Sequence, residues 1–157
     1  MANFWFNTGK LRCWAGATGE VDLINDAAVK MVAHEDVTGA DTDDEFLGDY
    51  IGTATEVTST GYTGGFGGAG RLALASKALA VDQANNRAEF DCANLTWTAI
   101  SQAAAETWVG FSVVKEVTND GLSPAICLID TGTGIPLTPN GSDITLTIDA
   151  EGLLHIT

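Results

Sequence analysis

Acidic side chains are the most obvious groups with potential chemistry in this 157-residue chain, and seven of its 21 acids fall in residues 34–50. An EF-hand calcium loop would need glycine at its sixth position and glutamate at its twelfth; counted from Asp41, these positions hold Phe46 and Gly52. Two carboxylates could flank a glycosidic bond, but with so many acids the sequence selects no pair. The segment is therefore interpreted as a solvated acidic loop, and no metal site is predicted.

The glycine-rich stretch 63–71, TGGFGGAGR, could in principle wrap an anion with its backbone N–H groups. No Gly-Lys-Ser/Thr motif follows it, and the surrounding charge is negative, so nucleotide binding is not predicted. The two histidines, His34 and His155, accompany no nucleophile motif such as GxSxG. We therefore predict no catalytic residue and no cofactor, and expect the protein not to be an enzyme.

The three cysteines, Cys13, Cys92 and Cys127, form no CxxC or Cys/His pattern. A zinc site is therefore not expected, and Cys92 and Cys127 are interpreted as small buried hydrophobic residues. Reduced thiols of this kind fit synthesis in a cytoplasm.

Composition restricts the partners. The net charge is −14, and the seven lysines and arginines are scattered singly, which argues against nucleic acid as a partner. No apolar run approaches the ~20 residues of a membrane span. The acidity is interpreted as a source of solubility and of repulsion between free copies.

Short apolar runs separated by turn residues recur along the chain, a pattern typical of an antiparallel β-sandwich or barrel. Residues 72–80 are rich in Leu and Ala, which favours helix, but the flanking glycine and Asn-Asn turns favour strands, and we predict strands. The alternating run 143–149 is expected to turn at residues 150–152 and pair with 153–156 as a hairpin. The length fits a single domain, residues 1–157, with an extended N-terminal arm over residues 1–20. Within it, Phe4 to Trp14 could instead form an opening strand.

Several segments together resemble a family of small structural proteins encoded by tailed bacteriophages. These segments are GYTGG at 61–65, VDQANNRAEFD at 81–91, LTWTA at 95–99, WVGFSVVK at 108–115 and TPNGSDITLTIDAEGLLHIT at 138–157. The resemblance covers residues 27–157 through the order and spacing of these segments. The chain differs in its longer N-terminal arm, in Asp149 where the family often has Asn, and in an Ala-rich insertion near Gln102.

The resemblance implies a non-enzymatic virion protein made in the bacterial host cytoplasm. We expect a capsid decoration or cement protein that docks on the major capsid protein as a homo-oligomer such as a trimer. The alternative is a tail or fibre module that binds other virion proteins or host surface glycans. The residues expected at the interface are apolar or lie in the glycine-rich loop: Phe4, Trp5, Phe6, Gly64, Gly65, Phe66, Gly67 and Gly68.

Overall fold

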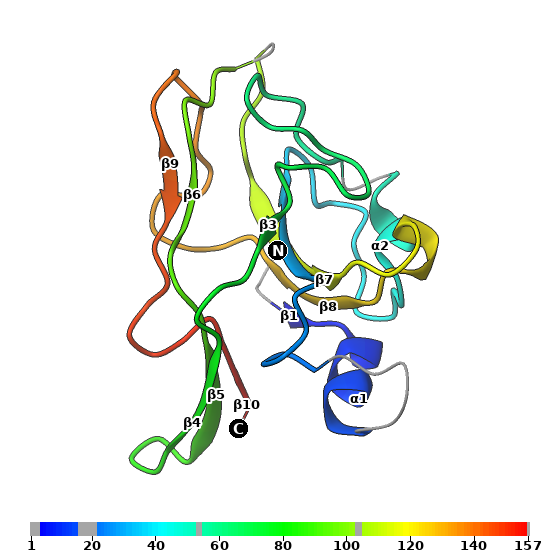
Figure 1. The fold of residues 1–157 in the computed structure, drawn as a ribbon, viewed down its shortest axis with the longest axis vertical. Coiled ribbons are helices and arrows are strands. Elements are labelled where there is room, and N and C mark those ends of the chain that lie inside the picture. The colour runs from blue at the N-terminus through cyan, green and yellow to red at the C-terminus, as the bar shows by residue number, and fades with distance from the viewer. Residues whose placement is uncertain (1–3, 16–21, 53–54, 103–104, 157) are drawn as a thin grey trace.

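The computed structural model describes residues 4–15, 22–52, 55–102 and 105–156, and its architecture is all-β (Figure 1). Ten strands form three separate antiparallel sheets, accompanied in the described residues by two short α-helices and one 3-10 turn, η1 (Asp120–Leu122). The prediction of an all-β chain is confirmed. The run SQAAAE at Ser101–Glu106, whose composition suggests a helical turn, lies partly outside the described residues.

The largest sheet has five strands in the order β1-β8-β7-β2-β3. Its centre consists of β2 (Val29–His34), β7 (Gly110–Lys115) and β8 (Ala125–Ile129), all rich in apolar residues because both faces of the sheet are covered. The edges are the short strands β1 (Phe4–Trp5) and β3 (Leu72–Ala73). The strands of this sheet therefore coincide closely with the apolar runs of the sequence.

Two smaller sheets stand beside the five-stranded sheet (Figure 1). One has the order β10-β5-β4, and the other pairs β6 with β9. Their strands are short, and their bounds are β4 Ala78–Asp82, β5 Arg87–Asp91, β6 Leu95–Trp97, β9 Ile144–Leu146 and β10 Leu154–Ile156. The predicted strands within 72–80 are confirmed, and the Asn85-Asn86 turn joins β4 to β5.

Both faces of the large sheet are buried. On one face Met31, Phe111 and Val113 pack with Trp97 and Trp108, where the aromatic rings meet edge-on or stacked. On the other face, Val32, Val114 and Leu128 pack with residues of the N-terminal segment and of α2 (Leu47–Tyr50). The tryptophans at 97 and 108 are therefore core residues and cannot line an exposed groove.

The prediction of an extended N-terminal arm is wrong for residues 4–15. Phe4 and Trp5 form β1, which pairs with Leu128 and Cys127 of β8, and residues Asn7–Ala15 form the helix α1. Phe6 is 0% exposed, and its ring stacks on Tyr50 with centroids 5.1 Å apart. Gly9 lets the helix lie against β8, because a Cβ there would approach the carbonyl oxygen of Ile126 to 2.5 Å. Phe4, Trp5 and Phe6 therefore pack within the chain itself.

The predicted C-terminal hairpin is also wrong. Both segments are strands, but β9 pairs with β6, with Leu146 opposite Leu95, and β10 pairs with β5, with Leu154 opposite Phe90. Alternation of apolar and polar residues predicts a strand but does not indicate which strand it pairs with. Here β9 and β10 pair with strands that are distant in the sequence, and not with each other.

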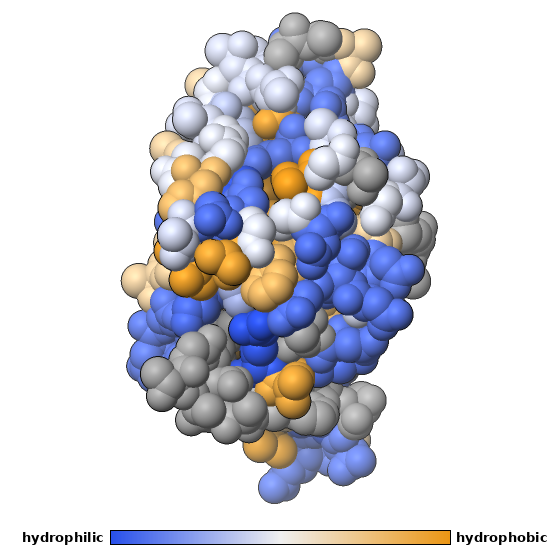
Figure 2. Space-filling model, turned by 90° about the vertical axis from the view of Figure 1, so that its right-hand side faces the viewer, coloured by the Kyte–Doolittle hydropathy of each residue, from blue (hydrophilic) through white to orange (hydrophobic). Residues whose placement is uncertain are grey.

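The helices are short and lie on one side of the molecule (Figure 1). Figure 2 shows this side, where hydrophilic residues dominate and hydrophobic ones form small separate areas. In the described part of the chain, neither helix has the length and apolar character needed to cross a membrane.

Candidate functional site

The glycine loop, defined here as residues 63–70, connects Tyr62 to Arg71 and β3. Its backbone turns back on itself: the N–H of Gly70 donates to the carbonyl oxygen of Thr63 at 2.9 Å, and the N–H of Gly68 donates to Gly65 at 2.9 Å. Gly65 and Gly67 have positive φ values of 79° and 72°, which other residues adopt only with strain. Phe66 between them is 45% exposed. The loop therefore presents a single aromatic side chain on a tightly folded backbone.

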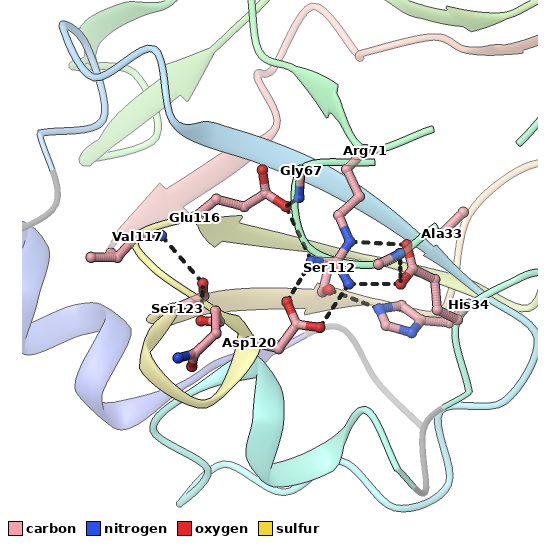
Figure 3. A network of polar contacts seen from close by, with 12 residues as sticks. Ala33, His34, Gly67, Arg71, Ser112, Glu116, Val117, Asp120 and Ser123 are labelled. Carbon is pink, nitrogen blue, oxygen red and sulfur yellow. Dashed lines mark hydrogen bonds and ion pairs between the residues drawn. The ribbon is translucent and has the colours of Figure 1, made fainter. Parts of the chain in front are cut away.

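Arg71 anchors the end of this loop. Its side chain is 0% exposed, and it donates two hydrogen bonds to Glu56, with Nε 3.0 Å from Oε1 and one terminal nitrogen 2.7 Å from Oε2. It also donates two to Asp120, at 2.6 and 3.1 Å, and one to Glu116 at 3.1 Å (Figure 3). One guanidinium thus joins three carboxylates that come from separate segments of the chain.

The same carboxylates hold the glycine loop directly. The N–H of Gly65 donates to Glu56 at 3.0 Å. The N–H of Gly67 donates to Glu116 at 3.0 Å, as Figure 3 shows. Both N–H groups flank Phe66 in the sequence, so they fix the backbone on either side of the exposed ring. The Arg71 network, defined as Arg71, Glu56, Glu116 and Asp120, therefore determines where Phe66 lies.

The charges of this network are strongly coupled. Burial opposes ionisation of Glu56, but hydrogen bonds from Arg71 and Gly65 together with the Arg71 charge outweigh it, and the pKa of Glu56 lies below its ordinary value. Burial likewise opposes the charge of Arg71, yet its pKa is raised because Glu56 and Asp120 accept its hydrogen bonds. By formal charge, one guanidinium and three carboxylates give the network a net charge of −2.

Tyr62 connects the network to the core. Its hydroxyl donates to Glu56 at 2.8 Å and accepts from the N–H of Ala33 in β2 at 3.2 Å. Its ring meets Trp108 edge-on at 5.6 Å. Burial, followed by the neighbouring Glu56 charge, raises the pKa of Tyr62, so the hydroxyl stays protonated. The surface loop is thereby tied to the centre of the large sheet.

The two segments predicted to form an interface lie apart. Phe4 and Trp5 form one edge strand of the large sheet, whereas the glycine loop leads into β3 at the opposite edge. Four strand spacings separate the edges, about 19 Å. Phe6 is inaccessible and is removed from the set of interface residues, and Phe4 and Trp5 are only half-buried. Among the predicted interface residues, the glycine loop is the segment that exposes an aromatic ring on a fixed backbone.

Sequence reasoning missed the Arg71 network. The sole signal available was a single arginine directly after a glycine run in a strongly acidic chain. Nothing in the sequence indicates which of the 21 acids would contact it.

A serine–histidine pair was also missed. His34 Nε2 lies 2.7 Å from Ser112 Oγ (Figure 3), a distance that a general base and a nucleophile would need. Both side chains are 0% exposed, enclosed between the large sheet and α2. No substrate reaches this pair, and its role is to satisfy two polar groups within the core.

The acidic loop uses its carboxylates to hold its own backbone. Asp41 accepts from the N–H of Asp43 at 3.0 Å, and Asp49 accepts from the N–H groups of Glu45 and Phe46 at 3.0 and 2.8 Å. Partial burial, followed by the charges of neighbouring aspartates, raises the pKa of Asp44. The loop therefore consists of turns whose backbone N–H groups donate to aspartate side chains, and it leads into α2.

In the described residues, one group of three acids brings possible metal-ligating oxygens within 4.8 Å of one another: Asp82, Glu89 and Glu151. Arg87 lies among them, with Nε 3.3 Å from Asp82 and 2.8 Å from Glu89, and it also pairs with Glu151. The guanidinium therefore already pairs with all three acids of this cluster and joins β4, β5 and the turn before β10.

A cleft of about 700 Å³ lies between the large sheet and the segment that carries β9 and β10. Phe4 and Trp5 line it, together with Thr131, Thr145 and Thr147. Its volume is in the range of small-molecule sites. Asp149 and His155 are the titratable residues among those that line it.

Comparisons with protein-family models, with curated protein sequences and with solved structures found no match. The site is therefore interpreted from its own geometry and from the sequence resemblance described above.

Proposed function

We propose that the protein is a non-enzymatic structural component of a tailed-bacteriophage virion, a decoration or cement protein that docks on the major capsid protein. The observation that carries the docking role is Phe66, exposed at the tip of a loop whose backbone is fixed on both sides by the Arg71 network. Aromatic side chains on pre-organised loops are typical binding hot spots, because little conformational entropy is lost on docking.

The charge of the chain supports the same role. A net charge of −14 keeps free copies apart in solution, so that specific docking, rather than general adhesion, determines where they accumulate. The family resemblance in residues 27–157 supports a virion component, and docking on the major capsid protein at the capsid surface is the part that we propose.

The test is the occupancy of purified virions by added protein, with Phe66→Ala as the variant and Leu122→Ala as its control. Leu122 is an equally exposed apolar residue, 51% against 45% for Phe66, and it lies outside the glycine loop. We expect Phe66→Ala to weaken binding about 30-fold, the effect of a hot spot, and Leu122→Ala to leave it unchanged. Equal binding by both variants would refute docking through the loop.

The alternative, a tail or fibre module that binds host surface glycans, is favoured by the cleft that Phe4 and Trp5 line. Immuno-gold labelling of virions separates the two proposals. Label on the head supports the decoration role, and label on the tail or fibres overturns it. In the second case, Trp5→Ala should abolish glycan binding on an array, while Phe66→Ala should not.

A further inference from the structure

Strand β4 is an exposed edge with apolar side chains. It is the outer strand of the sheet β10-β5-β4, and its residues Ala78–Val81 are exposed. Leu79 and Val81 are 65% and 74% exposed, the highest values among the large hydrophobic residues of the described chain. They are two positions apart, so they lie on the same face of the strand.

Natural edge strands are usually protected from pairing by a charge, a proline or a bulge. Ala78–Val81 has none of these, and its pairing with β5 is regular from Ala78 opposite Asp91 to Asp82 opposite Arg87. The hairpin is also well fixed: Asp82 accepts from the N–H groups of Ala84 and Asn85 at 3.0 and 3.2 Å, and Arg87 pairs with Glu89. A rigid strand with unpaired backbone groups is thus available for β-sheet extension.

From this edge we infer that a second copy of the chain pairs with β4, antiparallel to it, to form a continuous six-stranded sheet across a two-fold axis. The inference rests on the proposed function, for which the sequence resemblance leads us to expect a homo-oligomer, and it names the surface and the symmetry of that association. A two-fold contact of this kind makes a dimer rather than a trimer.

Charge favours a copy of this chain as the occupant. In a protein of net charge −14, residues 78–81 are uncharged, so two copies can approach here without placing like charges together. Lys77 precedes the strand and Asp82 ends it, so an antiparallel arrangement places the basic end of each strand beside the acidic end of the other. A parallel arrangement would place like charges side by side. The segment is therefore complementary to itself in the antiparallel orientation.

The geometry of antiparallel pairing restricts the register. A two-fold axis perpendicular to the sheet must pass midway between the two copies of one residue, because opposite residues point to the same face. With the axis at Ala80, Leu79 lies opposite Val81 of the second copy, and this pair occurs twice. Four exposed apolar side chains then meet on one face. Because one short strand buries little area, we expect a weak contact, with dissociation constants of roughly 0.01–1 mM, that is strengthened where copies are concentrated on a surface.

The first test is sedimentation velocity of the full chain from about 10 µM to 1 mM. The wild-type chain should shift towards a dimer, and the double variant Leu79→Lys, Val81→Lys should remain monomeric. The control is Val117→Lys with Leu122→Lys, which places the same charges at residues that are 52% and 51% exposed outside β4. The control should dimerise like the wild-type chain. A wild-type chain that stays monomeric at 1 mM, or a β4 variant that still dimerises, would overturn the inference.

The second test reads the register by oxidative cross-linking. Ala80→Cys places two thiols directly opposite one another, whereas Ala78→Cys, on the same face of the same strand, separates them by about 13 Å. Ala80→Cys should therefore give at least tenfold more disulfide-linked dimer, and equal yields would overturn the contact through Ala80.

Both tests use the isolated chain and need no virion. A chain that dimerises through β4 but labels no virion refutes the proposed function alone. A chain that decorates capsids but never dimerises refutes the strand contact alone.

Discussion

Replacement of Arg71 by Met tests whether the Arg71 network organises the glycine loop. Methionine matches most of the length of the side chain but removes the charge and all five hydrogen bonds to Glu56, Glu116 and Asp120. Three carboxylates, 10%, 8% and 25% exposed, then face one another without a cation. Removing one partner of a buried ion pair costs about 3–5 kcal/mol of unfolding free energy. We expect a loss in this range, or about 6–20 °C in Tm.

The pH dependence distinguishes this mechanism from simple loss of packing. In the folded wild-type chain the pKa of Glu56 lies below its ordinary value of 4.5, so its ionisation stabilises the fold above pH 4.5, and this stabilisation is lost as the pH falls through the folded pKa. In Arg71→Met the same carboxylate has lost its partner, so its negative charge destabilises the fold and acid relieves the repulsion. The difference in unfolding free energy between the two chains should be largest near pH 7 and should shrink below pH 4.5.

Urea unfolding monitored by tryptophan fluorescence at several pH values measures this difference. Arg12→Met is the matched control, because Arg12 is 24% exposed and pairs with a half-exposed Glu45, an arrangement worth about 0–1 kcal/mol. Amide hydrogen exchange should also show faster exchange at Gly65 and Gly67 in Arg71→Met alone. A loss below about 1 kcal/mol that does not change with pH, equal to that of Arg12→Met, would refute the reasoning.

Two further predictions concern packing. Phe6→Ala should lower the unfolding free energy by about 3–5 kcal/mol, because the ring is fully buried against Tyr50. Phe66→Ala should change the unfolding free energy by less than about 0.5 kcal/mol. Chemical unfolding of both variants measures the difference, and equal stabilities would contradict the assignment of Phe6 to the core. Burial, followed by the Asp91 charge, raises the pKa of Cys92 to about 11, so its alkylation by iodoacetamide at pH 8 should be about 100-fold slower in the folded chain than in urea. Peptide mapping by mass spectrometry measures both rates, and similar rates would show that the thiol is accessible.

The sequence predicted the central strands well because their apolar content reflects burial on both faces. Strands β2, β7 and β8 fall on apolar runs of the sequence, and the short helix α2 falls where the apolar residues Phe46, Leu47 and Tyr50 suggest a helical turn. The N-terminal helix α1 was missed because its sequence, NTGKLRCWA, contains a glycine and a threonine that disfavour helix. Its stability comes from contacts with β8 that only the folded chain reveals.

Pairing between distant strands could not be predicted. Alternation identifies β9 and β10 as strands, and local turn residues suggest that they pair with each other, but Leu95 and Phe90 supply better apolar partners from far upstream. The candidate site shows the same limit. The exposed loop around Phe66 was visible in the sequence as a run of glycines, whereas the choice of Glu56, Glu116 and Asp120 as partners for Arg71 depends on how three separate segments converge.

The pairing of β10 with β5 has a consequence for synthesis on the ribosome. Phe90, 3% exposed in the folded chain, has Leu154 as its cross-strand neighbour, so β5 has an open edge until residues 154–156 have been translated. The nascent polypeptide must therefore leave this edge and the Phe90 ring without their partner strand while the residues between β5 and β10 are added. Chains of this topology fold slowly and are vulnerable to premature aggregation, so we expect newly made copies to depend on chaperones more than their small size suggests.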